Sequence, residues 1–127
     1  HSDFNNTLIY LDKTIELNSN FADAYYVKGL LFRTNLQDYP NAIKAFDNFI
    51  SAYPGSVYRE DAMFWRFDSA YQFAVGSRLD LMTERLIEAK EAYEVLEKYY
   101  PSGKYTEEVT EMIEDINERL QVEETIN

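Results

Sequence analysis

The chain has 127 residues, a formal net charge of −11 and a pI near 4.4. This acidity makes nucleic acid and anionic membrane surfaces poor partners, because both are bound through clustered Lys and Arg. The absence of cysteine excludes disulfides, Cys-ligated zinc and a thiol nucleophile. A chain that is 46% hydrophobic and 16% aromatic can bury a core, which excludes a disordered acidic tail.

Helices are predicted along the whole chain, because Pro and Gly are scarce and apolar residues recur at three- and four-residue spacing. Asp38 is the expected N-cap of the third helix, and Pro40 suits its first turn. The chain after Val122 is expected to fray. The apolar positions of the six helices are, in order, Leu8, Leu11, Ile15, Leu17; Phe21, Ala24, Tyr25, Gly29, Phe32; Ala42, Ile43, Phe46, Phe49, Ile50; Ala62, Met63, Trp65, Ala70, Tyr71, Phe73; Leu86, Ala89, Tyr93, Leu96; and Val109, Met112, Ile113, Ile116, Leu120.

A ladder of a small residue, an aromatic residue and a turn residue recurs along the chain. Its copies are Asn6, Tyr10 and Asn18; Ala42, Phe46 and Pro54; and Ala89, Tyr93 and Pro101. The corners that follow the last two copies also match, as YPGSVYRED from Tyr53 and YPSGKYTEE from Tyr100. The second step is 47 residues and the first only 36, so the second repeat is lengthened between Tyr71 and Leu86. Either longer helices or a longer connection would account for the excess.

This ladder resembles the tetratricopeptide (TPR) repeat, in which helices A and B alternate in antiparallel pairs. The matching positions are Tyr25, Gly29 and Phe32 in helix A, and Ala42, Phe46 and Pro54 in helix B. The resemblance implies an all-α fold, a right-handed solenoid of about six antiparallel helices in one domain. Its expected units are a half-repeat 3–18, a repeat 21–54, an extended repeat 57–101 and a capping helix 104–122. We expect the chain to be the C-terminal part of a longer array, or else its first helix to pack irregularly.

A narrower resemblance covers roughly Phe21 to Leu120. The segment DYPNAIKAFDNFISAYPGSVYREDAMFWRFDSAYQFA, followed by the lengthened last repeat with Arg85, is similar to the outer-membrane assembly lipoproteins called BamD or YfiO. The resemblance implies a lipoprotein on the periplasmic face of the outer membrane, anchored through a cysteine upstream of this chain. It implies that the C-terminal repeats bind the periplasmic POTRA repeats of the barrel insertase BamA.

The residues offer little for catalysis, so no catalytic, cofactor or metal site is predicted. His1 is the only histidine and is interpreted as a tag remnant. Without cysteine or an internal histidine, no nucleophile–base pair can be assembled. The carboxylates between Glu107 and Glu118 lack the Asp-rich loop of a Ca²⁺ site, and their spacing is typical of a solvated helix face.

Partner-binding residues are predicted from TPR geometry, which directs one stripe of each A helix into a concave groove. The stripe comprises Tyr26, Leu30, Arg33, Phe64, Asp68 and Tyr71. Phe64, rather than Trp65, is expected to face the groove, although both could instead be partly buried between repeats. The function expected is therefore a non-catalytic protein-binding scaffold of the BamD type. Alternatives are a general TPR adaptor that binds a peptide in the groove, or the scaffold region of a larger enzyme or substrate-binding protein.

Overall fold

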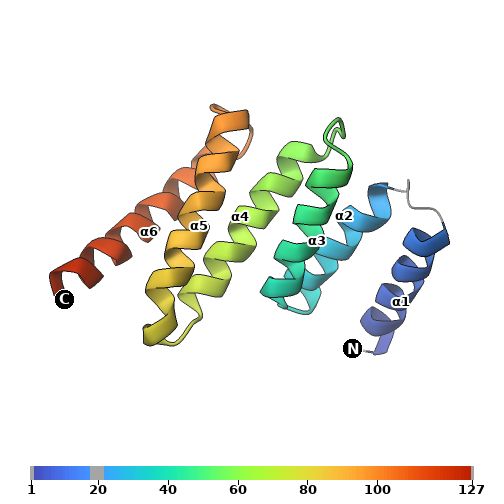
Figure 1. Ribbon diagram of the computed structural model, residues 1–127, viewed down its shortest axis with the longest axis horizontal. Helices are drawn as coiled ribbons and strands as arrows, with labels where there is room; N and C mark the ends of the chain where they lie inside the picture. Colours follow the sequence, from blue (N-terminus) through green and yellow to red (C-terminus); the bar gives the residue numbers. More distant parts are fainter. Residues whose placement is uncertain (1, 18–21, 127) are drawn as a thin grey trace.

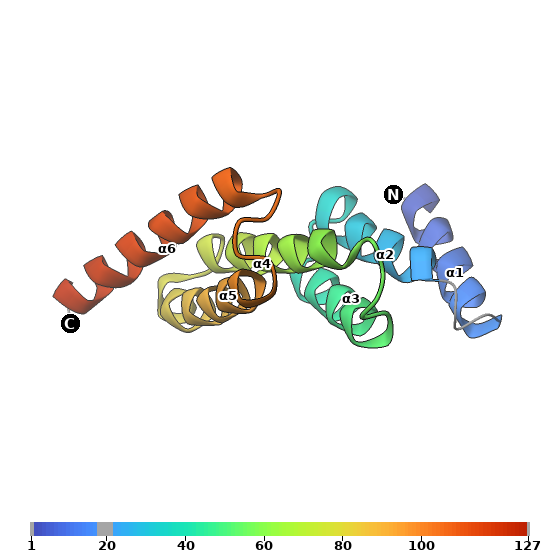
Figure 2. The same cartoon turned by 90° about the horizontal axis from the view of Figure 1, so that it is seen from above.

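The computed structural model describes residues 2–17 and 22–126, and in these ranges the regular secondary structure is entirely helical. The all-α, TPR-like solenoid predicted from the sequence is confirmed. Consecutive helices run antiparallel along a row (Figure 1), and Figure 2 shows α2, α4 and α6 in one layer with α3 and α5 in the other. The elements are α1 (Ser2–Leu17), α2 (Ala22–Leu30), a π-helical segment η1 (Leu31–Asn35), α3 (Tyr39–Ala52), α4 (Arg59–Val75), α5 (Leu79–Tyr99) and α6 (Thr106–Ile126).

The helix starting at Tyr39 begins where the sequence predicts. The Asp38 carboxylate accepts hydrogen bonds from the backbone N–H of Asn41 at 3.3 Å and from its side-chain amide at 2.7 Å. Pro40 occupies the first turn, where its missing N–H would have no helical partner. The N-cap prediction for Asp38 is therefore confirmed.

The need for glycine at position 29 is explained by Phe46, which packs against it from α3. A Cβ at Gly29 would lie 2.6 Å from Cε1 of Phe46, whose side chain is fully buried. The absence of a side chain thus lets the Phe46 ring lie against the backbone of α2. Ala42, one turn before Phe46, is also fully buried, so α2 and α3 approach closely at these positions.

The excess length of the second repeat lies in its helices. The helix α4 continues to Val75 and α5 begins at Leu79, so only residues 76–78 connect them. With 21 residues, α5 is half as long again as the 14-residue α3. Phe67 stands near the position that Gly29 holds in the preceding repeat, and its buried ring lies 6.0 Å from that of Tyr93. Of the two explanations left open by the sequence, longer helices are correct.

The ends of the chain depart from the expectations. Tyr10 is 70% exposed, so it does not occupy a buried position equivalent to Phe46, whereas Leu11 beside it is buried. Asn18 and Phe21 lie outside the described residues. The last helix spans Thr106–Ile126, which extends past the predicted end at 122. The expected fraying after Val122 is therefore wrong for the backbone.

Candidate functional site

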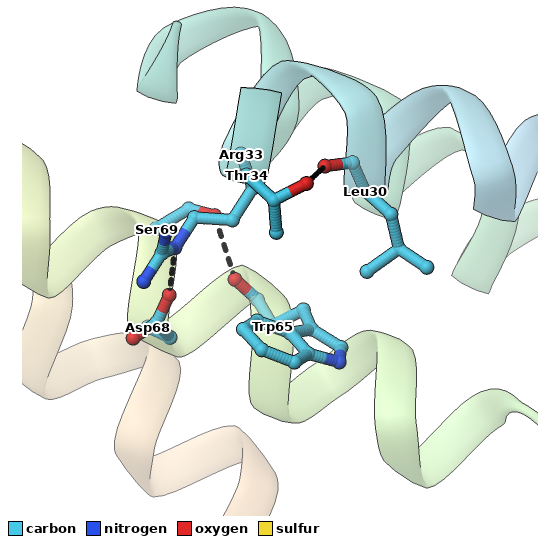
Figure 3. A network of polar contacts seen from close by, with 6 residues as sticks. All are labelled: Leu30, Arg33, Thr34, Trp65, Asp68 and Ser69. Carbon is cyan, nitrogen blue, oxygen red and sulfur yellow. Dashed lines mark hydrogen bonds and ion pairs between the residues drawn. The ribbon is translucent and has the colours of Figure 1, made fainter. Parts of the chain in front are cut away.

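The predicted groove residues lie on two neighbouring A-type segments, α2–η1 and α4. The structure brings Arg33 and Asp68 into an ion pair, in which the guanidinium Nε donates to the carboxylate (Figure 3). The guanidinium carbon also lies 5.6 Å from the centre of the Trp65 ring and 5.7 Å from that of Tyr39. The exposed fraction of the Asp68 side chain is only 9%, so the arginine compensates a carboxylate that is largely removed from water.

The π-helical segment carries this arginine. In η1 the backbone N–H of Leu36 donates to the carbonyl of Leu31 at 3.1 Å, five residues earlier, and Thr34 Oγ1 donates to the carbonyl of Leu30 at 2.7 Å. The hydrogen bond to Asp68 raises the pKa of Arg33, although its partial burial acts in the opposite direction. Such π-helical turns are rare in proteins, and this one carries the arginine that pairs with Asp68.

The prediction that Phe64 faces the groove is wrong. Phe64 is only 6% exposed, and its ring stacks on that of Tyr105 with centroids 4.0 Å apart and planes at 5°. Trp65 is half-buried and meets Phe64 edge-on at 5.2 Å. The alternative, in which both aromatic residues lie between repeats, describes the structure better. Phe64 does not face the groove because Tyr105, in the second corner, covers its ring.

The two copied corners make the same contact through their second tyrosine. Tyr58, from the first corner, stacks on Tyr26 of α2 with centroids 5.1 Å apart and planes at 9°. Tyr105, from the second corner, stacks on Phe64 of α4 in the same manner. Each corner tyrosine thus lies flat on an aromatic ring of the preceding A-type helix. We call these two ring pairs the corner stacks.

Two tyrosine–carboxylate pairs join α4 to the second corner and α6. Tyr105 donates a hydrogen bond to Asp61, near the start of α4. Ten residues further along both segments, Tyr71 Oη donates to Asp115 Oδ2 at 2.6 Å. Both pairs are separated by 44 residues, so α6 runs parallel to α4 in one constant register. Sequence reasoning missed these pairs.

The acids of the first corner also bind the second corner. Glu60 and Asp61 lie in the first turn of α4, where acids are favourable. In addition, Glu60 Oε2 accepts a 2.8 Å hydrogen bond from the backbone N–H of Lys104, whose Nζ lies 2.7 Å from Asp61. The repeated acid pair was therefore the signal that could have revealed these contacts.

The ionisable groups in these contacts are held in defined protonation states. Burial and the hydrogen bond to Asp115 raise the pKa of Tyr71 to about 12. Burial also pushes the pKa of Asp115 upward, but hydrogen bonds from Tyr71 and Arg119 outweigh it and leave that pKa below its ordinary value. Tyr71 therefore stays a neutral donor and Asp115 a charged acceptor at neutral pH.

The remaining predicted groove residues are partly or wholly engaged in packing. Tyr26 and Leu30 are half-buried and pack on the cluster around Phe46 and Phe49. Within the described residues, no group of three or more His, Cys, Asp or Glu side chains is placed to hold a metal ion. None of the helices described is both long and apolar enough to cross a bilayer. Chemically, the arrangement fixes the orientation of one repeat relative to the next.

Comparison with known protein families gives a match to the part of the chain that contains these contacts. A family model described as YfiO, outer membrane lipoprotein, matches residues 32–126, which run from η1 to the end of α6. The matched range includes both corner stacks except Tyr26, and both tyrosine–carboxylate pairs. No curated protein matches the chain.

Proposed function

The chain belongs to the YfiO family of outer membrane lipoproteins, and we propose that it is a non-catalytic scaffold in the machinery that assembles β-barrel proteins in that membrane. The observation that carries this proposal is the family match over residues 32–126, which covers the array from η1 to the end of α6. The lengthened α4–α5 pair within that range agrees with the lengthened last repeat that the sequence resemblance requires.

The proposed partner is the periplasmic part of a BamA-type insertase, its POTRA repeats. The acidic net charge of −11 favours a partner surface that carries Lys and Arg. The corner stacks and tyrosine–carboxylate pairs support a rigid array, and a rigid surface loses little conformational entropy when it binds. The proposed location is the periplasmic face of the outer membrane.

The half-buried residues Tyr26, Leu30, Arg33 and Tyr71 remain predicted partner contacts. Their side chains already make contacts between helices, so we propose that they act mainly by holding the surface in shape. A peptide-binding adaptor, which needs those side chains free in a groove, is less well supported for the same reason. Phe64 and Asp68 are removed from the set because both are buried.

Direct binding to purified POTRA repeats from the same organism tests this proposal. We expect saturable binding by isothermal titration calorimetry, weakened by added salt because the partner surface is basic. A matched control is a POTRA array whose exposed Lys and Arg are changed to Gln. Failure of the individual repeats and of the whole array to bind at micromolar concentrations would refute the proposal.

A further inference from the structure

An open cleft of about 650 Å³ lies between the start of α5 and the second half of α6. Its apolar lining comes from Leu79 and Met82 on α5 and from Val122 on α6. Leu79 is 82% exposed and Val122 is 54% exposed, so two apolar side chains face solvent across this opening. In the view of Figure 1, the C-terminal end of α6 points away from the start of α5.

The lengthened repeat supplies one wall of this cleft. Leu79 and Met82 belong to the excess residues that the sequence places between Tyr71 and Leu86. Arg119 Nη1 on α6 lies 4.0 Å from the sulfur of Met82 on α5, so the two walls touch at this point. The insertion that distinguishes this repeat therefore builds an apolar surface that the packing of α5 on α6 leaves uncovered.

The rim of the cleft is acidic. The acids at the cleft are Asp80, Asp115 and Glu118. Arg78 pairs with Asp80 at 3.1 Å and Arg119 pairs with Asp115 at 2.8 Å, so Glu118 leaves the rim with a net negative charge. The acids Glu107, Glu108, Glu111 and Glu114 precede this lining on α6 and add to the negative charge of that helix. A second copy of this chain would bring the same acidic rim against itself, and an anionic bilayer would be repelled. Charge complementarity therefore favours a basic protein partner with an apolar stripe.

We propose that this cleft binds an amphipathic helix of a protein partner. Apolar side chains of that helix enter between Leu79, Met82 and Val122, and a flanking Lys or Arg side chain meets Glu118. Helix-in-groove binding uses anchors at i, i+3 or i+4, and i+7, and the volume suits several such side chains. The inference rests on the proposed scaffold function and deepens it by naming a docking surface.

The test uses a synthetic peptide with leucines at this helical spacing, lysines beside the leucines and a fluorescent label. Fluorescence anisotropy should give saturable binding, about tenfold weaker for Leu79→Ser and for Val122→Ser, because each removes an apolar anchor. Val57→Ser is the matched control, because Val57 is 85% exposed and lies on the first corner. Glu118→Lys should also weaken binding, whereas Glu94→Lys, at an exposed position on α5, should not.

Three results would overturn the inference: no binding of the peptide, equal binding to all variants, or equal binding of a peptide with glutamate in place of lysine. Sedimentation that shows a dimer lost in Leu79→Ser would also overturn it, with a second copy as the occupant. Measuring POTRA binding in parallel separates the two proposals. POTRA binding without peptide binding would refute the docking cleft and leave the scaffold function standing. Peptide binding without POTRA binding would refute the proposed POTRA partner and leave the docking cleft standing.

Discussion

Tyr71 on α4 and Asp115 on α6 are joined by a 2.6 Å hydrogen bond in the same register that joins Asp61 to Tyr105. The donor and acceptor exchange helices between the two pairs: the tyrosine belongs to the second corner in one and to α4 in the other. Between them the two pairs hold α6 at both its start and its middle. Hydrogen bonds to a charged carboxylate are stronger than neutral ones, so these contacts weigh heavily in the position of α6.

Removal of the Tyr71 hydroxyl should loosen α6 and change the alkaline stability. Tyr71→Phe is expected to lower the free energy of unfolding by about 1 kcal/mol at pH 7. The pKa of Tyr71 is raised from 10.0 to about 12 in the folded chain, so its contribution is complete below pH 10 and is lost as the pH rises toward 12. Urea unfolding at several pH values measures both effects. Tyr99→Phe, at a half-exposed ring, is the control, and an unchanged alkaline profile in Tyr71→Phe would contradict the prediction.

A methyl group at Gly29 should destabilise the contact between α2 and α3. Alanine is better than glycine in a helix by about 1 kcal/mol, but overpacking a core costs about 1–3 kcal/mol. The overpacking should prevail, because three ring atoms of the fully buried Phe46 would lie within 2.9 Å of the new Cβ. Gly55→Ala is the control, since a Cβ there meets nothing within 4 Å. Equal urea midpoints for the two variants would contradict this account.

Truncation of Phe64 should reduce stability rather than binding alone. Phe64→Ala removes a 6% exposed ring and one half of a corner stack, at an expected cost of about 3 kcal/mol. Thermal unfolding followed by circular dichroism measures this cost. Val57→Ala, at an 85% exposed side chain, should melt like the parent chain. If Phe64→Ala kept its melting temperature and lost partner binding, Phe64 would return to the set of groove residues.

The ion pair between Arg33 and Asp68 should matter more than a comparable pair nearer the surface. Arg33→Met leaves the buried Asp68 carboxylate unpaired and should cost about 3 kcal/mol, of which Asp68→Leu in the same chain should recover most. In the control pair, Arg66 and Asp47 are 30% and 47% exposed, so Arg66→Met should cost less than about 1 kcal/mol. Chemical denaturation of the single and double variants measures the coupling. Similar losses of unfolding free energy for Arg33→Met and Arg66→Met would show that burial does not set the strength of these ion pairs.

The helical repeat could be predicted from the sequence because its determinants are local. Ala42, Phe46 and Pro54 recur as Ala89, Tyr93 and Pro101, and each such triplet marks a helix that must bury one face and then stop. Membership of the family could be predicted for the same reason, since the lengthened second repeat is visible as a change of spacing.

The interior of the candidate site could not be predicted in the same way. The sequence repeats at 47 residues, whereas α4 and α6 pair at 44, which differs by nearly one helical turn. The shift of α6 along the axis of α4 is set by packing in the folded structure. This shift places Tyr105 over Phe64. The π-helical turn at Leu31–Asn35 was equally invisible, because the residues around it keep their expected repeat positions.

Because α6 points away from α5 toward its C-terminal end, a small tilt of this helix would move that end the most. Its 21 residues span about 31 Å, and the contacts with Tyr105 and Asp115 leave the far end projecting beyond its supports. A tilt of about 5° about the Tyr71–Asp115 contact would displace Ile126, at the end of the helix, by about 1.4 Å. Occupation of the cleft should accordingly strain the Tyr71–Asp115 hydrogen bond, and Tyr71→Phe should alter affinity at a surface that Tyr71 itself does not line.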